Sequence, residues 1–168
     1  NAPVYIGSDM SSQVIANAEK VISSSYSLNT SDGNGNGSAY DELFLADNNT
    51  NGAQNEFIFV IQFDGLNSQT WGGGTFMVHA PIGGSMDPSI FGVNGGWGGL
   101  RTTKALVDKF EYSITAKDGD GYPIAWSDSR AMFHTDGQNY EMEKVAPFKE
   151  GYGVTKFRNV DVTGAAGS

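Results

Sequence analysis

The stretch that decides the fold is NGGWGGLRTTKALVDKFE, residues 94–111, in which four glycines and an asparagine surround Trp97. Glycine in such a setting can belong to a phosphate loop, to a loop that presents a ring for sugar stacking, or to a plain structural turn. A Walker loop ends in Gly-Lys-Ser/Thr, whereas here Gly99 runs into Leu100, and no strand is evident before it. The phosphate loop is therefore excluded, and the other two uses of glycine stay open.

The segment that follows the glycines has the spacing of an amphipathic helix. Leu106, Val107 and Phe110 fall on one face, which predicts a helix over residues 102–110. We expect the glycines next to Trp97 to form the turn that leads the chain into this helix.

Composition narrows the kind of ligand. The chain has 168 residues, long enough for one domain with a real core, and a net charge of −9 from 10 basic and 19 acidic residues. Because the basic residues form no run, nucleic acid is an unsuitable partner. There is no cysteine, and no stretch approaches the roughly 18 apolar residues that span a bilayer. Only 17% of the residues are charged, whereas glycines are numerous and 12% of the residues are aromatic. This composition suggests ordered loops that bind a neutral ligand.

The remaining pattern predicts an α+β fold with long irregular loops. Residues 8–24 carry an apolar stripe at helical spacing, whereas residues 57–63 form an apolar, β-branched and aromatic run typical of a buried strand. No regular element is expected between residues 64 and 99. The other expected elements are a short helix at 40–47, a turn at 118–121, and short strands within 130–135 and 153–159.

A polar loop matches the first half of a calcium-binding EF-hand. Asp32, Asn34 and Asn36 have the required spacing, but the twelfth position, which needs a bidentate glutamate, is Leu43. We therefore predict a polar loop that folds without calcium, and whether it can bind the ion stays open. No metal and no cofactor is predicted for the chain.

Motifs for catalysis are missing. His79 and His134 lie in unlike contexts, and there is no HExxH, no GxSxG and no cysteine nucleophile. We therefore predict that the protein is not an enzyme. A glycoside hydrolase stays open as an alternative, because the spacing of its paired carboxylates is a three-dimensional property.

Two tryptophans in glycine-rich loops are the predicted ligand-binding residues. The apolar C–H face of a sugar stacks on an exposed indole, while nearby amides bond its hydroxyl groups. Trp71 and Trp97 have this setting, and Asn67 and Asn94 are their expected companions. Trp126 follows YPIA and is expected to pack inward. The alternative for each loop tryptophan is a place in the core.

Six segments, in this order and spacing, resemble the middle of SusD/RagB proteins. They are NAEKVISSSYSL, YDELFLADN, NEFIFVIQFDG, GWGGLRTTKALVDKF, SDSRAMF and YGVTKFRN. The resemblance covers nearly the whole chain. It implies a surface lipoprotein of the Bacteroidetes outer membrane, which captures oligo- or polysaccharide and passes it to a SusC-like TonB-dependent transporter.

The resemblance also implies a domain organisation. Residues 8–24 would be one helix of a tetratricopeptide-like scaffold, and residues 25–168 an irregular inserted subdomain, so that the chain is a single piece of a longer protein. The apolar stripe of residues 8–24 would then lack its partner repeats, and we expect self-association or low stability. The alternative function is a segment that contacts the transporter and leaves glycan recognition to other repeats.

The turn after Trp97 suggests two further contacts. Thr102 and Thr103 are placed to satisfy N–H groups in the first turn of the helix. Arg101 is expected to pair with a carboxylate, for which Asp128 is the candidate.

Overall fold

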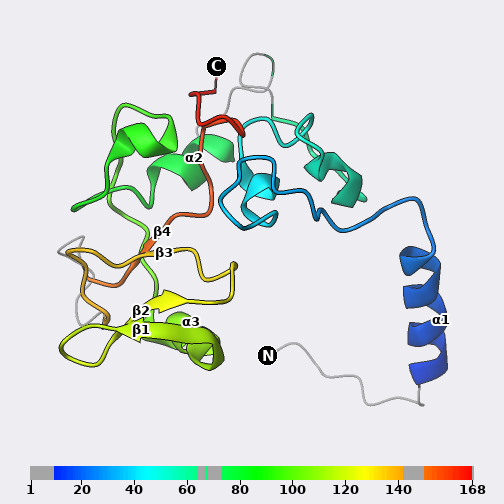
Figure 1. Cartoon of the computed structure of the whole chain (residues 1–168). Coiled ribbons are helices and arrows are strands. Elements are labelled where there is room, and N and C mark those ends of the chain that lie inside the picture. Colours follow the sequence, from blue (N-terminus) through cyan, green and yellow to red (C-terminus); the bar gives the residue numbers. More distant parts are fainter. Residues whose placement is uncertain (1–9, 64–66, 68–72, 142–149, 168) are drawn as a thin grey trace.

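The computed structural model describes residues 10–63, 67, 73–141 and 150–167. They form a loop-rich α+β structure with short helices and two antiparallel two-stranded sheets, which confirms the expected mixture of helix and strand (Figure 1). The elements are α1 (Ser11–Ile22), η1 (Asp41–Phe44), η2 (Ala53–Glu56), α2 (Gly74–His79), η3 (Pro88–Phe91), α3 (Lys104–Val107), η4 (Asp108–Ser113), β1 (Ile114–Lys117), β2 (Pro123–Trp126), β3 (Phe133–His134) and β4 (Gly153–Val154).

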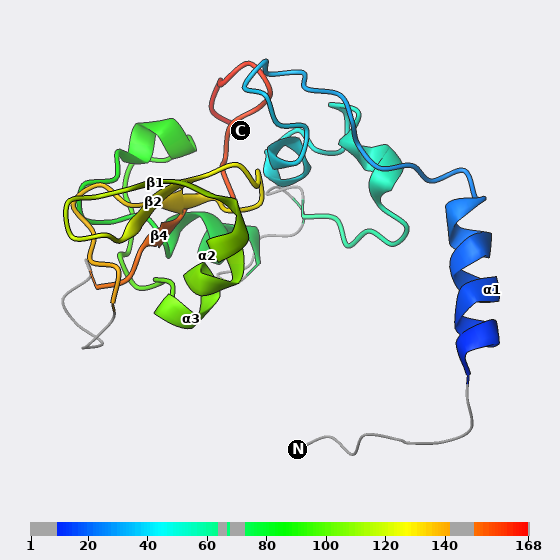
Figure 2. The same ribbon diagram turned by 60° about the horizontal axis from the view of Figure 1, so that its bottom comes forward.

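Helix α1 confirms the helix expected at residues 8–24 but stands apart from the described body of the chain in both views (Figures 1 and 2). It buries none of its residues. Val14 is 64% exposed and Ile22 is 79% exposed. The apolar stripe is therefore uncovered, and the expected self-association or low stability stays a prediction.

The strand expected at residues 57–63 is wrong. The chain there is irregular, and its apolar side chains face outward, with Phe59 86% and Ile61 71% exposed. A β-branched and aromatic run becomes a strand only where a neighbouring edge pairs with it, and no described segment does so here. The segment is apolar, as its sequence shows, but its side chains are exposed and not buried as predicted.

Two helices lie in the region where the sequence predicted no element. The chain from α2 to just after η3 forms a buried cluster of Ile82, Met86 and Phe91, with Val78 and Val93 packed against it. Asp87 caps η3 by accepting a hydrogen bond from the backbone N–H of Ser89 at 2.9 Å. A proline in the first turn of η3 fits this start, because its missing N–H would have no helical partner there.

A second buried cluster lies between α3 and the β1–β2 hairpin. Its buried members are Val107, Tyr140 and Tyr152. Trp126 packs edge to face against Tyr152 and Phe133, which confirms the expectation that it lies inward. The turn expected at residues 118–121 is also confirmed, because it closes this hairpin through the bond from the N–H of Asp118 to the carbonyl of Tyr122.

The segment 152–160 ties the clusters to the rest of the described chain. Strand β4 pairs with β3, which confirms the two expected short strands. The backbone N–H of Tyr152 donates to the Thr102 hydroxyl, and the N–H of Asn159 donates to the Phe91 carbonyl at 2.9 Å. Farther on, the N–H of Ala46 donates to the Val160 carbonyl. One extended segment thus reaches residues from three distant parts of the sequence.

Glu42 organises the polar loop at residues 29–42. Its side chain is fully buried, and its carboxylate accepts from the backbone N–H groups of Gly33 and Asn34 and from the Asn29 amide. The Asp32 carboxylate is used in the same way, by the N–H groups that follow it. Carboxylate oxygens therefore replace missing backbone partners in this loop. No described group of three or more His, Cys, Asp and Glu side chains is placed to hold a metal ion.

The glycine-rich stretch lies directly against the backbone that follows α2. The N–H of Trp97 donates to the His79 carbonyl at 2.9 Å, and the N–H of Gly98 donates to the Ile82 carbonyl at 2.8 Å. A Cβ on Gly96 would lie 2.2 Å from that Ile82 carbonyl oxygen. Only glycine permits this approach. Gly98 has a φ of 62°, which confirms the expected turn.

The expected helix after the turn is confirmed as α3 continued by η4, but its start differs from the expectation. Thr103 occupies the N-cap without a side-chain hydrogen bond to the first turn. Thr102 is buried and accepts from the N–H of Tyr152 instead. The Thr102 hydroxyl, which was expected to bond the first turn of the helix, is used by the long-range bond from Tyr152.

Replacing Gly96 tests the close approach. We expect Gly96→Ala to lower the free energy of unfolding by about 1–3 kcal/mol, because the new methyl group collides with backbone that must then shift. The matched control is Gly95→Ala, where a Cβ meets nothing within 4 Å and the change should stay within about 0.5 kcal/mol. Urea denaturation of both variants measures this, and equal stabilities would contradict the close contact.

Replacing Glu42 tests the organisation of the polar loop. Glu42→Gln turns one accepting oxygen into an NH₂ group that faces N–H donors, so we expect a loss of about 1–3 kcal/mol. Glu111→Gln makes the same change at an exposed residue of η4 and should have little effect. A Glu42→Gln protein as stable as the Glu111→Gln control would show that the buried carboxylate is not required.

Candidate functional site

Trp97 presents a partly exposed indole on a fixed loop. Its side chain is 44% exposed, and its ring stacks on the His79 imidazole with the centroids 5.4 Å apart and the planes at 20°. Phe76, one helical turn before His79, lies 6.1 Å away in a tilted arrangement. Three rings from α2 and the glycine-rich turn thus form one aromatic group, which we call the Trp97 platform.

The supports of the Trp97 platform are themselves held in place. The His79 Nδ1 atom lies 2.9 Å from the carbonyl oxygen of Gly95, so the imidazole is bonded to the loop that carries the indole. The backbone bond from Trp97 to His79 fixes the same two residues a second time. A ring held in this way loses little conformational entropy when a ligand stacks on it.

Partly exposed apolar side chains of α2 lie in and beside the Trp97 platform. Phe76 is 45% exposed and Met77 is 42% exposed, and both lie on α2. A flat, partly exposed apolar surface of this kind suits the C–H face of a sugar ring better than a charged ligand.

The other predicted site residues are not brought together by any described contact. Trp71 lies outside the described residues. Asn94 is exposed on the same loop as Trp97, and Asn67 is exposed elsewhere in the chain. Their role beside the tryptophans stays a prediction.

Sequence reasoning missed the partners of Trp97. His79 and Phe76 belong to α2, in the region where no element was expected. Their spacing of three residues places them on one helical face, which is a signal that recognition of GTFMVH as a helix would have supplied.

The pairing expected between Arg101 and Asp128 is wrong. The Arg101 guanidinium donates to the carbonyl oxygens of Pro81 and Leu100, and its burial lowers its pKa. Asp128 binds Arg130 at 2.6 Å and accepts from Tyr112, and these contacts hold the pKa of its carboxyl well below the usual range. Because Asp128 and Arg130 are only two residues apart, Asp128 finds a partner within its own loop and not in the distant Arg101. Arg101 instead fastens the turn of Trp97 to the chain after α2.

The two histidines serve in separate places. His79 supports the indole, whereas the Nε2 atom of His134 lies 2.9 Å from the hydroxyl of Ser85. Ser85 also donates to the carbonyl of Asp136, so that it joins two loops.

Within the ranges that the structure describes, no helix is long and apolar enough to cross a membrane.

Comparison with known proteins gives one informative match. No family model matches the chain. The starch-binding protein SusD of Bacteroides thetaiotaomicron is 36% identical to it over 111 residues, which are 66% of this chain and 18% of SusD. The matched region is thus a small part of that protein, and the match is to a binding protein. It confirms the resemblance that the six sequence segments indicated, as a partial similarity to SusD over these 111 residues.

Proposed function

We propose that the chain is a glycan-binding part of a bacterial outer-membrane uptake system. In this proposal it binds oligosaccharide at the cell surface and passes it to a SusC-like TonB-dependent transporter, and a lipid anchor attaches the protein to the membrane. The observation that carries the proposal is the partly exposed Trp97 indole stacked on His79. The similarity to a starch-binding protein supports the ligand class.

A stacking platform explains binding without a charged pocket. The indole face attracts the C–H groups of a sugar through dispersion and the hydrophobic effect, neither of which requires ligand charge. Because the chain carries a net charge of −9, a neutral glycan avoids the repulsion that an anionic one would meet. Starch-derived α-glucans are the first ligands to test, since the similar protein is named for starch.

The domain assignment is part of the same proposal. Residues 8–24 would pack as a scaffold helix of a mostly α-helical, tetratricopeptide-like fold, and residues 25–168 would form the inserted subdomain. The uncovered apolar stripe of α1 supports this arrangement, because such a stripe is stable only against a partner surface.

A second candidate function is contact with the transporter. The exposed apolar run that includes Ile58, Phe59 and Ile61 favours it, because contiguous exposed apolar side chains mark interaction surfaces. In that case the chain would bind no glycan by itself. A glycan array probed with this chain and with the full-length protein separates the two functions, since only glycan recognition by the chain supports the first.

The two loop tryptophans give the direct test of glycan binding. We expect Trp97→Ala to weaken α-glucan binding by about ten- to hundredfold, equivalent to about 1–3 kcal/mol, because the stacking surface is removed. Trp71→Ala is expected to do the same. Isothermal titration with maltoheptaose measures the affinity, and thermal unfolding measures the stability.

Trp126→Ala is the matched control for these variants. Because Trp126 is partly buried and packs against the second cluster, its removal should cost about 3 kcal/mol of stability. The glycan affinity of the folded fraction should be unchanged. Lost stability with unaltered glycan affinity in Trp97→Ala would return that residue to the core and contradict the proposed platform.

A further inference from the structure

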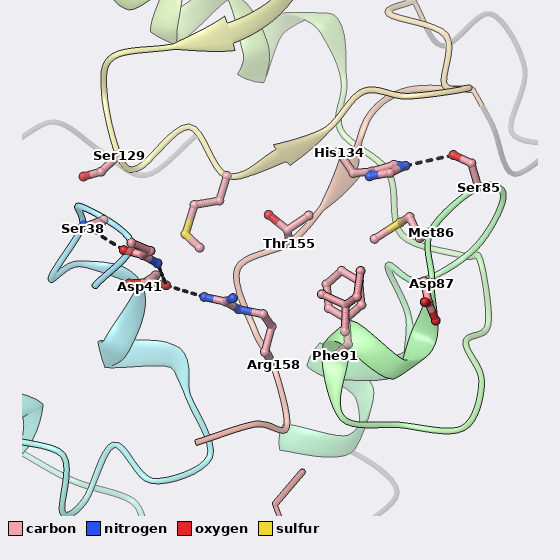
Figure 3. A pocket seen from close by; sticks show the side chains of 13 residues that line it. Ser38, Asp41, Ser85, Met86, Asp87, Phe91, Ser129, His134, Thr155 and Arg158 are labelled. Atoms are coloured by element: carbon pink, nitrogen blue, oxygen red, sulfur yellow. Dashed lines mark hydrogen bonds and ion pairs between the residues drawn. The ribbon is translucent and has the colours of Figure 1, made fainter. Parts of the chain in front are cut away.

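A pocket of about 460 Å³ lies away from the indole, among residues of the polar loop, η3, β3 and the segment after β4 (Figure 3). Asp41 and Arg158 stand at one end of it, and His134 and Ser85 at the other. Its volume falls within the range of about 300–1,000 Å³ that is usual for small-molecule sites. Neither the stacking proposal nor the comparison assigns it a role.

The Asp41 end is a buried polar network with unused bonding capacity. Asp41 pairs with Arg158 at 2.5 Å and also accepts from the Asn36 amide, and the two charged side chains are only 4% and 22% exposed. The Oδ1 atom of Asp41, the Nε atom of Arg158 and the hydroxyl of Ser38 have no hydrogen-bond partner among the described residues. A buried polar atom without a hydrogen-bond partner lowers the stability of the fold. A ligand with polar groups at this end would supply the missing partners of these three atoms.

The middle of the pocket is apolar. Met86 and Phe91 belong to the first buried cluster, and Met132 and the exposed Ile90 complete this part of the lining. Thr155 lies between the two polar ends (Figure 3). A ligand that fits must therefore combine an apolar face with hydrogen-bonding groups at its edges.

Charge balance narrows the ligand further. The Arg158 charge is already neutralised by Asp41, and Asp87 adds a carboxylate at the opposite side, so an anionic ligand would find no surplus positive charge. A purely apolar ligand would leave the Asp41 end unsatisfied. A neutral polyhydroxy ligand meets both conditions, because each hydroxyl both donates and accepts.

We propose that this pocket is a second carbohydrate site, which takes one sugar residue of a glycan. The proposal rests on the proposed function for its ligand class alone. Asp41, Arg158 and Ser38 bond hydroxyl groups, and Phe91 and Met86 contact the C–H face. A pocket of about 460 Å³ has room for one sugar residue between its two polar ends.

The first buried cluster connects the two sites. Met86 and Phe91 line the pocket and pack with Ile82, whose carbonyl accepts the N–H of Gly98 in the turn of Trp97. The two proposed contact points therefore adjoin the same buried cluster.

The test uses D-glucose as the probe and the His134 ring signals in NMR as the readout. We expect glucose to shift these signals in a saturable way. Thr155→Phe, which fills the middle of the pocket, should lower the glucose affinity at least tenfold. Thr115→Phe makes the same change on the exposed face of β1, outside the pocket, and should leave glucose binding unchanged. Trp97→Ala should also leave the His134 shifts intact. If Thr155→Phe fails to fold, Ser129→Phe places the ring at another lining residue.

The two proposals fail separately. Absence of saturable His134 shifts with glucose, galactose, mannose and N-acetylglucosamine would overturn the pocket site, even if maltoheptaose still binds at Trp97. Equal glucose affinity in the Thr155→Phe and Thr115→Phe variants would overturn it as well. Glucose binding that survives Trp97→Ala but is lost in Thr155→Phe supports the pocket, whatever the outcome for the platform.

Discussion

The close packing of the glycine-rich turn against the backbone after α2 is the contact on which the proposed binding surface depends. Gly96 lies so near the Ile82 carbonyl that no side chain fits, and the N–H groups of Trp97 and Gly98 bond the carbonyls of His79 and Ile82. These bonds place the indole over the imidazole. Arg101 adds a third fastening through the Pro81 carbonyl. A bulkier turn would carry the tryptophan away from its support.

The glycines also make a structural turn compatible with the proposed sugar platform, since the turn they form carries the Trp97 indole. A turn built from backbone hydrogen bonds needs no covering side chains, and it therefore leaves Trp97 at the surface with 44% of its side chain exposed. The stacking on His79 then fixes the orientation of the ring. Local packing of the turn thus explains how an apolar side chain can be both ordered and available to a ligand.

The sequence predicted local features better than distant ones. Helix α1, the start of the turn at Gly98 and the inward position of Trp126 follow from spacing, glycine geometry and neighbouring residues. The strand expected at residues 57–63 failed because strand formation depends on a partner edge. The role of Thr102 and the partner of Arg101 failed for a related reason, since Tyr152 and Pro81 are brought near only by the tertiary fold. Helix α2 was missed because its six residues give too little periodicity. The His79 ring that supports Trp97 lies on this helix and was missed for the same reason.

The most direct measurement of the central claim is the position of a bound oligosaccharide relative to Trp97. Intermolecular nuclear Overhauser effects between maltoheptaose and the protein report which aromatic protons touch the sugar. The account predicts strong effects between the sugar C–H protons and the indole protons of Trp97, with weaker ones to Phe76. Effects confined to other residues, with the Trp97 indole untouched at saturating sugar, would contradict it.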